Sequence, residues 1–204
     1  MGFYNDVILP RLCHLVMQNR RLVPYRRRVI AAAEGRVMEI GIGSGLNLPF
    51  YGPQVREIVG VEPARQLVAM ARLVAQRMPI PVSFIEESAE AISLEDNTVD
   101  TVITTWTLCS VSRPDRALAE VRRVLKPSGR LLFVEHGLAP DVAVRKWQNW
   151  LTPAWTRVSG GCHLNRPIRN MVEAAGFRFD RLETAYMPGP KPWSFLYEGG
   201  AIRR

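Results

Sequence analysis

The chain has 204 residues and a mass of 23.0 kDa, which fits a single domain of ordinary size. Hydrophobic residues make up 47% of the sequence and charged residues 23%, and this composition excludes a disordered or fibrous protein. The formal net charge of +8 permits contact with nucleic acid, anionic lipid or acidic metabolites. Charge alone does not choose among these partners.

The N-terminus and the cysteines bear on the cellular compartment. No apolar run approaches the roughly 18 residues needed to span a bilayer, and the N-terminus lacks the ordered segments of a signal peptide. Cys13, Cys109 and Cys162 are odd in number and include no CxxC pair, which argues against a disulfide framework and against a structural zinc site. We therefore expect a cytoplasmic protein without a bound metal. We also expect the protein to be either a monomer or a homodimer.

Residues 1–34 are rich in arginine. Within them, Ile8, Leu12, Leu15 and Val16 recur at steps of three and four residues, which predicts an amphipathic helix. We expect residues 1–34 to form a basic helical lid that also makes peripheral contact with an anionic membrane surface. A solvated helix face is the alternative interpretation.

From residue 35 onward, short β-branched runs alternate with helical patterns. Strands are expected at 36–40, 57–61, 82–85, 99–104 and 131–135, and helices at 63–78 and 115–125. The turn Lys126-Pro127-Ser128-Gly129 is expected to end the second of these helices. This alternation predicts a parallel sheet that is covered on both faces.

The C-terminal part begins with an aromatic stretch. Trp147, Trp150 and Trp155 lie in an expected insertion at about 140–165, where they either pack in the core or cover a hydrophobic acceptor. A helix is expected at 167–175, followed by strands at 177–186 and 194–201 that a proline-rich loop joins. Residues 35–204 are therefore expected to form one α/β domain.

The most informative segment is an apolar strand that runs into three glycines. Gly41, Gly43 and Gly45 are spaced by two residues, and glycine is needed where the backbone turns with positive φ or lies against a ligand. A dinucleotide fingerprint has the spacing G-x-G-x-x-G, and its last position here is Leu46. A nicotinamide reductase is therefore the weaker interpretation.

Two carboxylates accompany the glycines. Glu62 ends the second expected strand, where it can accept hydrogen bonds from two ribose hydroxyls, and Glu39 just before the glycines suits an ammonium group. Together with the order of strands and helices, these residues resemble the class I S-adenosylmethionine-dependent methyltransferases. The resemblance implies a Rossmann-like α/β fold, with a mostly parallel seven-stranded sheet, helices on both faces and an antiparallel late strand. It also implies S-adenosylmethionine as the cofactor.

The same resemblance implies which residues contact the cofactor. They are expected to be Glu39, Gly41, Gly43, Gly45, Asn47, Glu62, Pro63, Ser88, Ala89, Thr105, Trp106 and Cys109. The family often has an Asp before Ala after the third strand, to bind the adenine amino group, where this chain has Ser88. The Ser88 hydroxyl, Glu87 or the backbone is expected to make that contact instead.

Residues after the fourth and fifth strands should line the acceptor pocket, because ligands bind at the carboxyl ends of strands in open α/β sheets. No Asn- or Asp-Pro-Pro-aromatic signature of enzymes that methylate nucleic-acid amines occurs there, so no nucleic-acid partner is expected. The segments Leu108-Cys109-Ser110-Val111, Glu135-His136, Pro153-Ala154-Trp155 and Gly161-Cys162-His163-Leu164-Asn165-Arg166 resemble small methyltransferases that include the mammalian alkyl-thiol enzymes. The segment from Glu39 to Pro49 also resembles bacterial phosphatidylethanolamine N-methyltransferases.

Two histidines are the candidate catalytic residues. His136 is the preferred general base, because an imidazole with a pKa near 6.5 can take a thiol or ammonium proton at neutral pH. A structural histidine is the alternative for His136, and His163 is the competing base. Glu135 is expected to orient one of the two rings. Trp106 or Tyr4 is expected to place a ring against the sulfonium, with packing as the alternative for Trp106.

The sequence thus predicts an S-adenosylmethionine-dependent methyltransferase that acts on a small, hydrophobic acceptor, with a thiol favoured. A phospholipid N-methyltransferase and a non-catalytic module that keeps the cofactor pocket are the alternatives. Asn165 and Arg166 are candidates for contacting the acceptor or the cofactor carboxylate.

Overall fold

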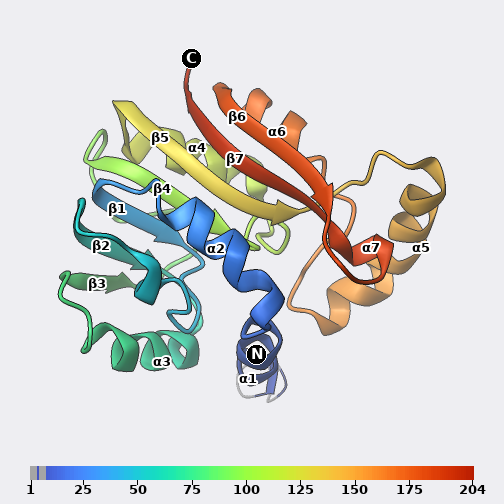
Figure 1. Cartoon of the computed structure of the whole chain (residues 1–204), viewed down its shortest axis with the longest axis horizontal. Coiled ribbons are helices and arrows are strands. Elements are labelled where there is room, and N and C mark those ends of the chain that lie inside the picture. Colours follow the sequence, from blue (N-terminus) through green and yellow to red (C-terminus); the bar gives the residue numbers. More distant parts are fainter. Residues whose placement is uncertain (1–3, 5–7) are drawn as a thin grey trace.

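A computed structural model describes Tyr4 and residues 8–204 of the chain. In this described part, seven strands form one sheet in the order β3-β2-β1-β4-β5-β7-β6 (Figure 1). The strands are β1 (Gly35–Ile40), β2 (Val55–Val61), β3 (Val82–Ile85), β4 (Val99–Thr105), β5 (Leu125–His136), β6 (Phe177–Tyr186) and β7 (Phe195–Arg203). The first five strands pair in parallel, and β7 runs antiparallel to β5 and β6. The predicted mostly parallel sheet with an antiparallel late strand is confirmed.

Helices lie on both faces of the sheet. They are α1 (Leu9–Met17), α2 (Val23–Ile30), α3 (Arg65–Ala75), α4 (Pro114–Val124), α5 (Val142–Val158), α6 (Ile168–Ala174) and α7 (Lys191–Ser194), with short 3₁₀ turns η2 (Arg20–Leu22) and η3 (Leu48–Phe50). In Figure 1, α2 crosses in front of the sheet, whereas α4 and α6 lie behind it. No helix within the described residues is long and apolar enough to cross a membrane.

The alternation of side chains along the strands divides the apolar residues between two cores, one on each face of the sheet. Successive side chains of a strand point to opposite faces, so Met38 of β1 packs in the core beneath α4 and α6, whereas Val37 packs in the core beneath α2. Val29 and Ile30 of α2 are buried in this second core. Within the basic segment 1–34, the second half is therefore packed against the sheet.

The end of α4 differs from the sequence prediction. The helix stops at Val124, and Leu125 is already an extended residue that pairs with Val99 of β4. The next pairing of these strands joins Arg130 to Thr101, so the turn at 126–129 forms an irregularity within β5 instead of a helix cap. Leu125 is fully buried, and its pairing with Val99 begins the strand directly after the helix.

The aromatic insertion contains a helix that the sequence prediction missed. Residues Val142–Val158 form the 17-residue helix α5, which continues through Pro153. Proline removes one backbone donor from a helix interior and normally predicts a break. Here the buried Gln148 anchors the helix, because its side chain bonds the backbone of Ala139, Gly137 and Pro192. In Figure 1, α5 lies at one end of the molecule beside α7.

Candidate active site

The glycine loop follows the carboxyl end of β1. Gly41, Gly43 and Gly45 have φ values of 66°, 55° and 78°, which disfavour any other residue. A Cβ at Gly41 would overlap the side chain of Thr107, and one at Gly45 would lie 3.1 Å from the backbone of Ala71. At Gly43 the nearest atom to such a Cβ is a loop carbonyl oxygen 3.8 Å away. Space beside Gly43 is therefore open for a ligand.

Glu62 faces this loop from the end of β2. Its two carboxylate oxygens accept hydrogen bonds from the backbone amides of Gly43, at 3.2 Å, and Ala64, at 3.0 Å. Burial raises the pKa of Glu62, and these two backbone bonds act in the opposite direction. The carboxylate thus lies beside the open space at Gly43, where the sequence predicts a ribose contact, and Pro63 is exposed next to it.

Glu39 lies beneath the loop and is almost fully buried. Asn47 donates to one carboxylate oxygen at 2.6 Å and Tyr51 donates to the other at 2.7 Å. Burial raises the pKa of Glu39 to about 7, while the bonds from Tyr51 and Asn47 lower it. Each carboxylate oxygen can accept a further hydrogen bond, and the predicted contact between Glu39 and an ammonium group stays a prediction.

Asn47 connects this network to the next strand and to α2. Its amide donates to Thr105 at 3.0 Å, and its carbonyl oxygen accepts from the buried Arg26 at 2.6 Å. The Arg26 guanidinium also lies 5.0 Å from the ring centroid of Trp106, which has a positive φ of 51°. The sequence reading missed Arg26, because a run of three arginines gives no sign that one of them is buried.

The loop after β3 carries the candidates for the adenine contact. Ser88 is exposed and its hydroxyl accepts a hydrogen bond from the backbone of Glu90, whereas Ala89 is buried. Both carboxylate oxygens of Glu87 bond Ser93, so this alternative partner is already engaged within its own loop. The Ser88 and Ala89 contacts remain predictions.

A buried carboxylate fixes the loop after β4. One oxygen of Glu135 accepts hydrogen bonds from the Thr104 hydroxyl at 2.9 Å and from the backbone amides of Thr107 and Leu108 at 3.0 and 3.1 Å. Its other oxygen has no partner among the described residues. These bonds hold the loop that carries Cys109, so the observed role of Glu135 differs from the expected orientation of a histidine ring.

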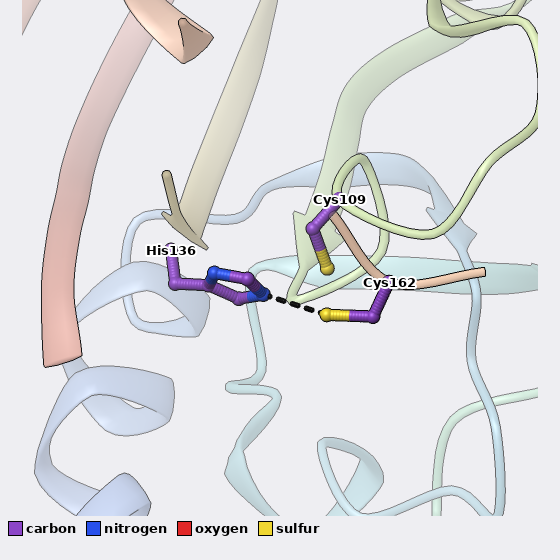
Figure 2. Close-up of side chains that lie close together, drawn as sticks. All are labelled: Cys109, His136 and Cys162. Carbon is purple, nitrogen blue, oxygen red and sulfur yellow. Dashed lines mark hydrogen bonds between the residues drawn. The ribbon is translucent and has the colours of Figure 1, made fainter. Parts of the chain in front are cut away.

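Three side chains from distant segments converge beside this loop (Figure 2). They are Cys109 after β4, His136 at the end of β5, and Cys162 after α5, and their ligand atoms lie within 4.8 Å of one another. Nε2 of His136 is 3.0 Å from Sγ of Cys162. A hydrogen bond with Cys109, together with burial, raises the pKa of Cys162, so in the protein alone this residue is a neutral thiol. We name this set the Cys-His cluster.

The second candidate base, His163, lies outside the Cys-His cluster. Its Nδ1 is 2.7 Å from the carbonyl oxygen of Gly161 and 3.2 Å from Nη2 of Arg166. Arg166 is buried and also donates to the carbonyl oxygen of Leu108. The structure therefore brings His136, and not His163, against the two cysteines.

Helix α1 lies next to both halves of this region. His14 Nδ1 is 2.7 Å from the hydroxyl of Ser44 in the glycine loop. On the other side, Leu9 lies against Gly160. A Cβ added to Gly160 would lie 3.0 Å from the Leu9 side chain. Tyr4 is exposed, and its hydroxyl donates to the carbonyl of Val158 at the end of α5. Contacts of α1 thus extend from the glycine loop to the loop after α5.

These features fit S-adenosylmethionine. The open space beside Gly43 can hold a ligand that lies against the backbone. The Glu62 carboxylate next to this space can accept hydrogen bonds from ribose hydroxyls. Glu39 and Glu62, the two acidic residues beside the loop, oppose a phosphate-containing cofactor. Thr105 ends β4, and Trp106 and Cys109 follow it at the same carboxyl edge of the sheet, where the donor methyl is expected to meet the acceptor.

Comparisons with known proteins agree with this arrangement. A family model described as a methyltransferase domain matches residues 38–133. The chain is 34% identical over 164 residues to thiol S-methyltransferase TMT1B of Rattus norvegicus, which covers 78% of this chain and 66% of that relative. It is 30% identical over 193 residues to thiol S-methyltransferase TMT1B of Homo sapiens, which covers 92% of this chain and 78% of that relative.

Two further comparisons concern a different acceptor and the fold. A phosphatidylethanolamine N-methyltransferase of Cereibacter sphaeroides is 34% identical over 116 residues, which cover 54% of this chain and 57% of that relative. The solved structure of a methyltransferase from Thermotoga maritima superposes with a TM-score of 0.69 at 21% identity, over 99% of this chain and 98% of that one. The chain is an enzyme that belongs to the class I S-adenosylmethionine-dependent methyltransferases and uses S-adenosylmethionine as its methyl donor.

Proposed function

We propose that this enzyme transfers a methyl group to the sulfur of a small, apolar thiol. The observation that carries the proposal is the Cys-His cluster at the carboxyl ends of β4 and β5, where two thiols and an imidazole meet. The two sulfur atoms are polarizable and the Cys162 thiol is neutral in the protein alone, so the cluster suits a sulfur-containing acceptor.

Arg166 adds an electrostatic preference to the same place. Burial lowers the pKa of Arg166, and the neighbouring Cys109 and Cys162 act to raise it. A thiol reacts as the thiolate, and the ordinary thiol pKa of about 8.5 leaves most of it protonated at neutral pH. A buried guanidinium stabilises the thiolate and repels an ammonium group, so it favours a thiol over an amine.

The named relatives support the same acceptor. The human relative described as a thiol S-methyltransferase matches 92% of this chain, so its match includes most of both the cofactor segment and the acceptor segments. The relative described as a phosphatidylethanolamine N-methyltransferase matches only 54% of it. Sequence similarity through the region of the Cys-His cluster therefore favours sulfur.

The proposal is tested by transfer of a labelled methyl group from S-adenosylmethionine to a panel of acceptors. The panel contains alkyl and aryl thiols, amines, phenols and phosphatidylethanolamine liposomes, and cofactor affinity is recorded by calorimetry on the same preparation. We expect label in the thioether products. Tight cofactor binding with label in an amine or phenol, and none in any thiol, would contradict the proposal.

A second candidate, methylation of a phospholipid amine, is favoured by an exposed apolar surface. Leu15 and Val16 of α1 are 66% and 60% exposed, and Trp147 and Trp150 of α5 are 56% and 71% exposed. Apolar and aromatic side chains on helices with nearby arginines are typical of helices that lie in a membrane interface. Flotation with liposomes that contain anionic lipid and phosphatidylethanolamine tests this candidate, and absence of the protein from the lipid fraction would remove it.

A further inference from the structure

The Cys-His cluster has the ligand types and the spacing of a metal site. Its three ligand atoms belong to three segments that are far apart in sequence, and all of them lie within 4.8 Å of one another. Figure 2 shows both sulfur atoms and the His136 ring turned toward a common point. In a tetrahedral zinc site with Zn–S bonds of about 2.3 Å, two sulfurs lie roughly 3.8 Å apart. Small side-chain movements would therefore place all three atoms around one ion.

The composition of the cluster selects the metal. Two thiolates and one imidazole are typical zinc ligands, whereas magnesium and calcium prefer oxygen. Catalytic zinc sites use three protein ligands and leave a fourth position for water or substrate. From this geometry we infer that Cys109, His136 and Cys162 bind a zinc ion whose fourth position takes the acceptor sulfur. The second half of this inference rests on the proposed function.

Burial gives the site one open side. Cys109 and His136 are buried, with 2% and 8% of their surface exposed, whereas Cys162 is partly exposed. Nδ1 of His136 is buried without a partner in the described part of the chain, and Nε2 is the atom that faces Cys162. The imidazole therefore offers Nε2 as the ligand, and an acceptor reaches the ion from the side of Cys162.

Charge balance favours a thiolate in the fourth position. Two cysteine thiolates neutralise the charge of Zn²⁺, so a bound acceptor thiolate leaves the site with one net negative charge. Arg166, held by its hydrogen bond to the carbonyl of Leu108, supplies a neighbouring positive charge. An amine in the same position would gain nothing from Arg166.

The chemical step is then balanced as follows. The acceptor thiol binds the ion and releases its proton to solvent, because coordination lowers the pKa of a thiol. The acceptor sulfur uses a lone pair to form the new C–S bond with the methyl carbon. The bond between that carbon and the cofactor sulfonium breaks, and its electron pair stays on the cofactor sulfur. A neutral thioether leaves the ion, and S-adenosylhomocysteine is released.

Metal content of the full chain tests the binding site directly. The protein is purified with a thiol-free reductant and without chelator, dialysed against metal-free buffer, and analysed for zinc by mass spectrometry. We expect about one zinc ion per chain in the unmodified protein and almost none in Cys109→Ser or Cys162→Ser. Cys13→Ser is the matched control and should keep its zinc, because Cys13 is outside the cluster. Circular dichroism checks that every variant is folded.

Cobalt substitution provides a second measurement that does not depend on a variant. Co²⁺ bound by the unmodified protein should show sulfur-to-metal charge-transfer absorption and the strong visible bands of a tetrahedral ion. Reduced, folded protein that carries no zinc and takes up no Co²⁺ would overturn the inference. A Cys109–Cys162 disulfide that persists in reductant and excludes metal would overturn it as well.

Activity separates this inference from the proposed function. Zinc removal by a chelator should abolish thiol methylation, and stoichiometric zinc should restore it, while cofactor affinity stays unchanged. Undiminished thiol methylation by the metal-free protein would overturn the inference and leave the proposed function standing. One zinc per chain without methylation of any thiol would support the metal site and contradict the proposed function.

Discussion

The cofactor half and the acceptor half of the site are built differently. Around the glycine loop, Glu39 and Glu62 hold protein donors on every carboxylate oxygen, and Asn47 joins β1, β4 and α2 in one buried network. Around the Cys-His cluster, by contrast, one oxygen of Glu135 and Nδ1 of His136 are buried without a partner in the described residues. The comparison indicates that hydrogen bonds within the chain already fix the carboxylates of the cofactor half. In the acceptor half, two buried polar atoms stay available to bind a ligand.

The largest effect on cofactor binding is expected from Gly43→Val. The φ of 55° is unfavourable for a β-branched residue, and the new side chain would enter the open space assigned to the cofactor. Cofactor affinity should fall by more than about 100-fold, which corresponds to roughly 3 kcal/mol. Calorimetry with S-adenosylmethionine measures it, and Gly52→Ala serves as the control outside the loop. Affinity within a few-fold of the unmodified protein would refute the assigned cofactor space.

Removal of the Glu135 carboxylate should destabilise the acceptor half. Glu135→Ala leaves two backbone amides and one hydroxyl without their shared acceptor, and each stranded buried group costs about 1–3 kcal/mol. We expect the free energy of unfolding to fall by about 3–5 kcal/mol in denaturant titrations. Thr104→Val removes one of the three donors and should cost about 1 kcal/mol. Equal losses in the two variants would argue against Glu135 as the anchor of the loop.

The buried Glu39 should make stability depend on pH in a defined direction. Its pKa of about 7 in the folded protein exceeds the ordinary value of 4.5, so the folded protein retains a proton that the unfolded chain releases in this range. Stability should therefore be highest below pH 4.5 with respect to this group, and fall by about 2–3 kcal/mol as the pH rises to about 7.

Glu39→Gln tests this dependence, because the amide imitates the protonated carboxyl in shape and in hydrogen bonding. Urea unfolding at pH values between 5 and 7.5 should show a smaller fall in stability for the variant than for the unmodified protein. Parallel curves for the two proteins would show that another group causes the dependence.

A smaller effect is expected from Glu62→Ala. Loss of this carboxylate removes the predicted ribose contact and leaves the Gly43 amide without its partner. Cofactor affinity should weaken by about 1–3 kcal/mol, the usual cost of a stranded polar group. Glu57→Ala changes a residue of β2 that forms a partly exposed ion pair with Arg36, and it should leave affinity unchanged. Equal affinities in both variants would remove Glu62 from the cofactor site.

Sequence patterns located the glycine loop and Glu62 but not the contacts within the Cys-His cluster, for physical reasons. Strand periodicity and glycine spacing are local signals, so β1, the glycine loop and Glu62 could be located from the sequence. The Cys-His cluster is a tertiary arrangement in which His136 and Cys162 are 26 residues apart, and their spacing matches no metal-binding motif. The expectation that the protein binds no metal depended on the spacing of the cysteines in the sequence. Helix α5 was missed because Pro153 predicted a break, and the buried hydrogen bonds that anchor the helix through Gln148 leave no periodic signal in the sequence.

The most direct test of the division between the two halves is one pair of measurements on His136→Ala. Calorimetry records the affinity for S-adenosylmethionine, and labelled methyl transfer records the turnover of an alkyl thiol, both on the same preparation. We predict cofactor affinity within about threefold of the unmodified protein, a change below 1 kcal/mol, and loss of thiol methylation. Unchanged thiol methylation would contradict the assignment of the Cys-His cluster to the acceptor, and loss of cofactor binding would contradict the independence of the two halves.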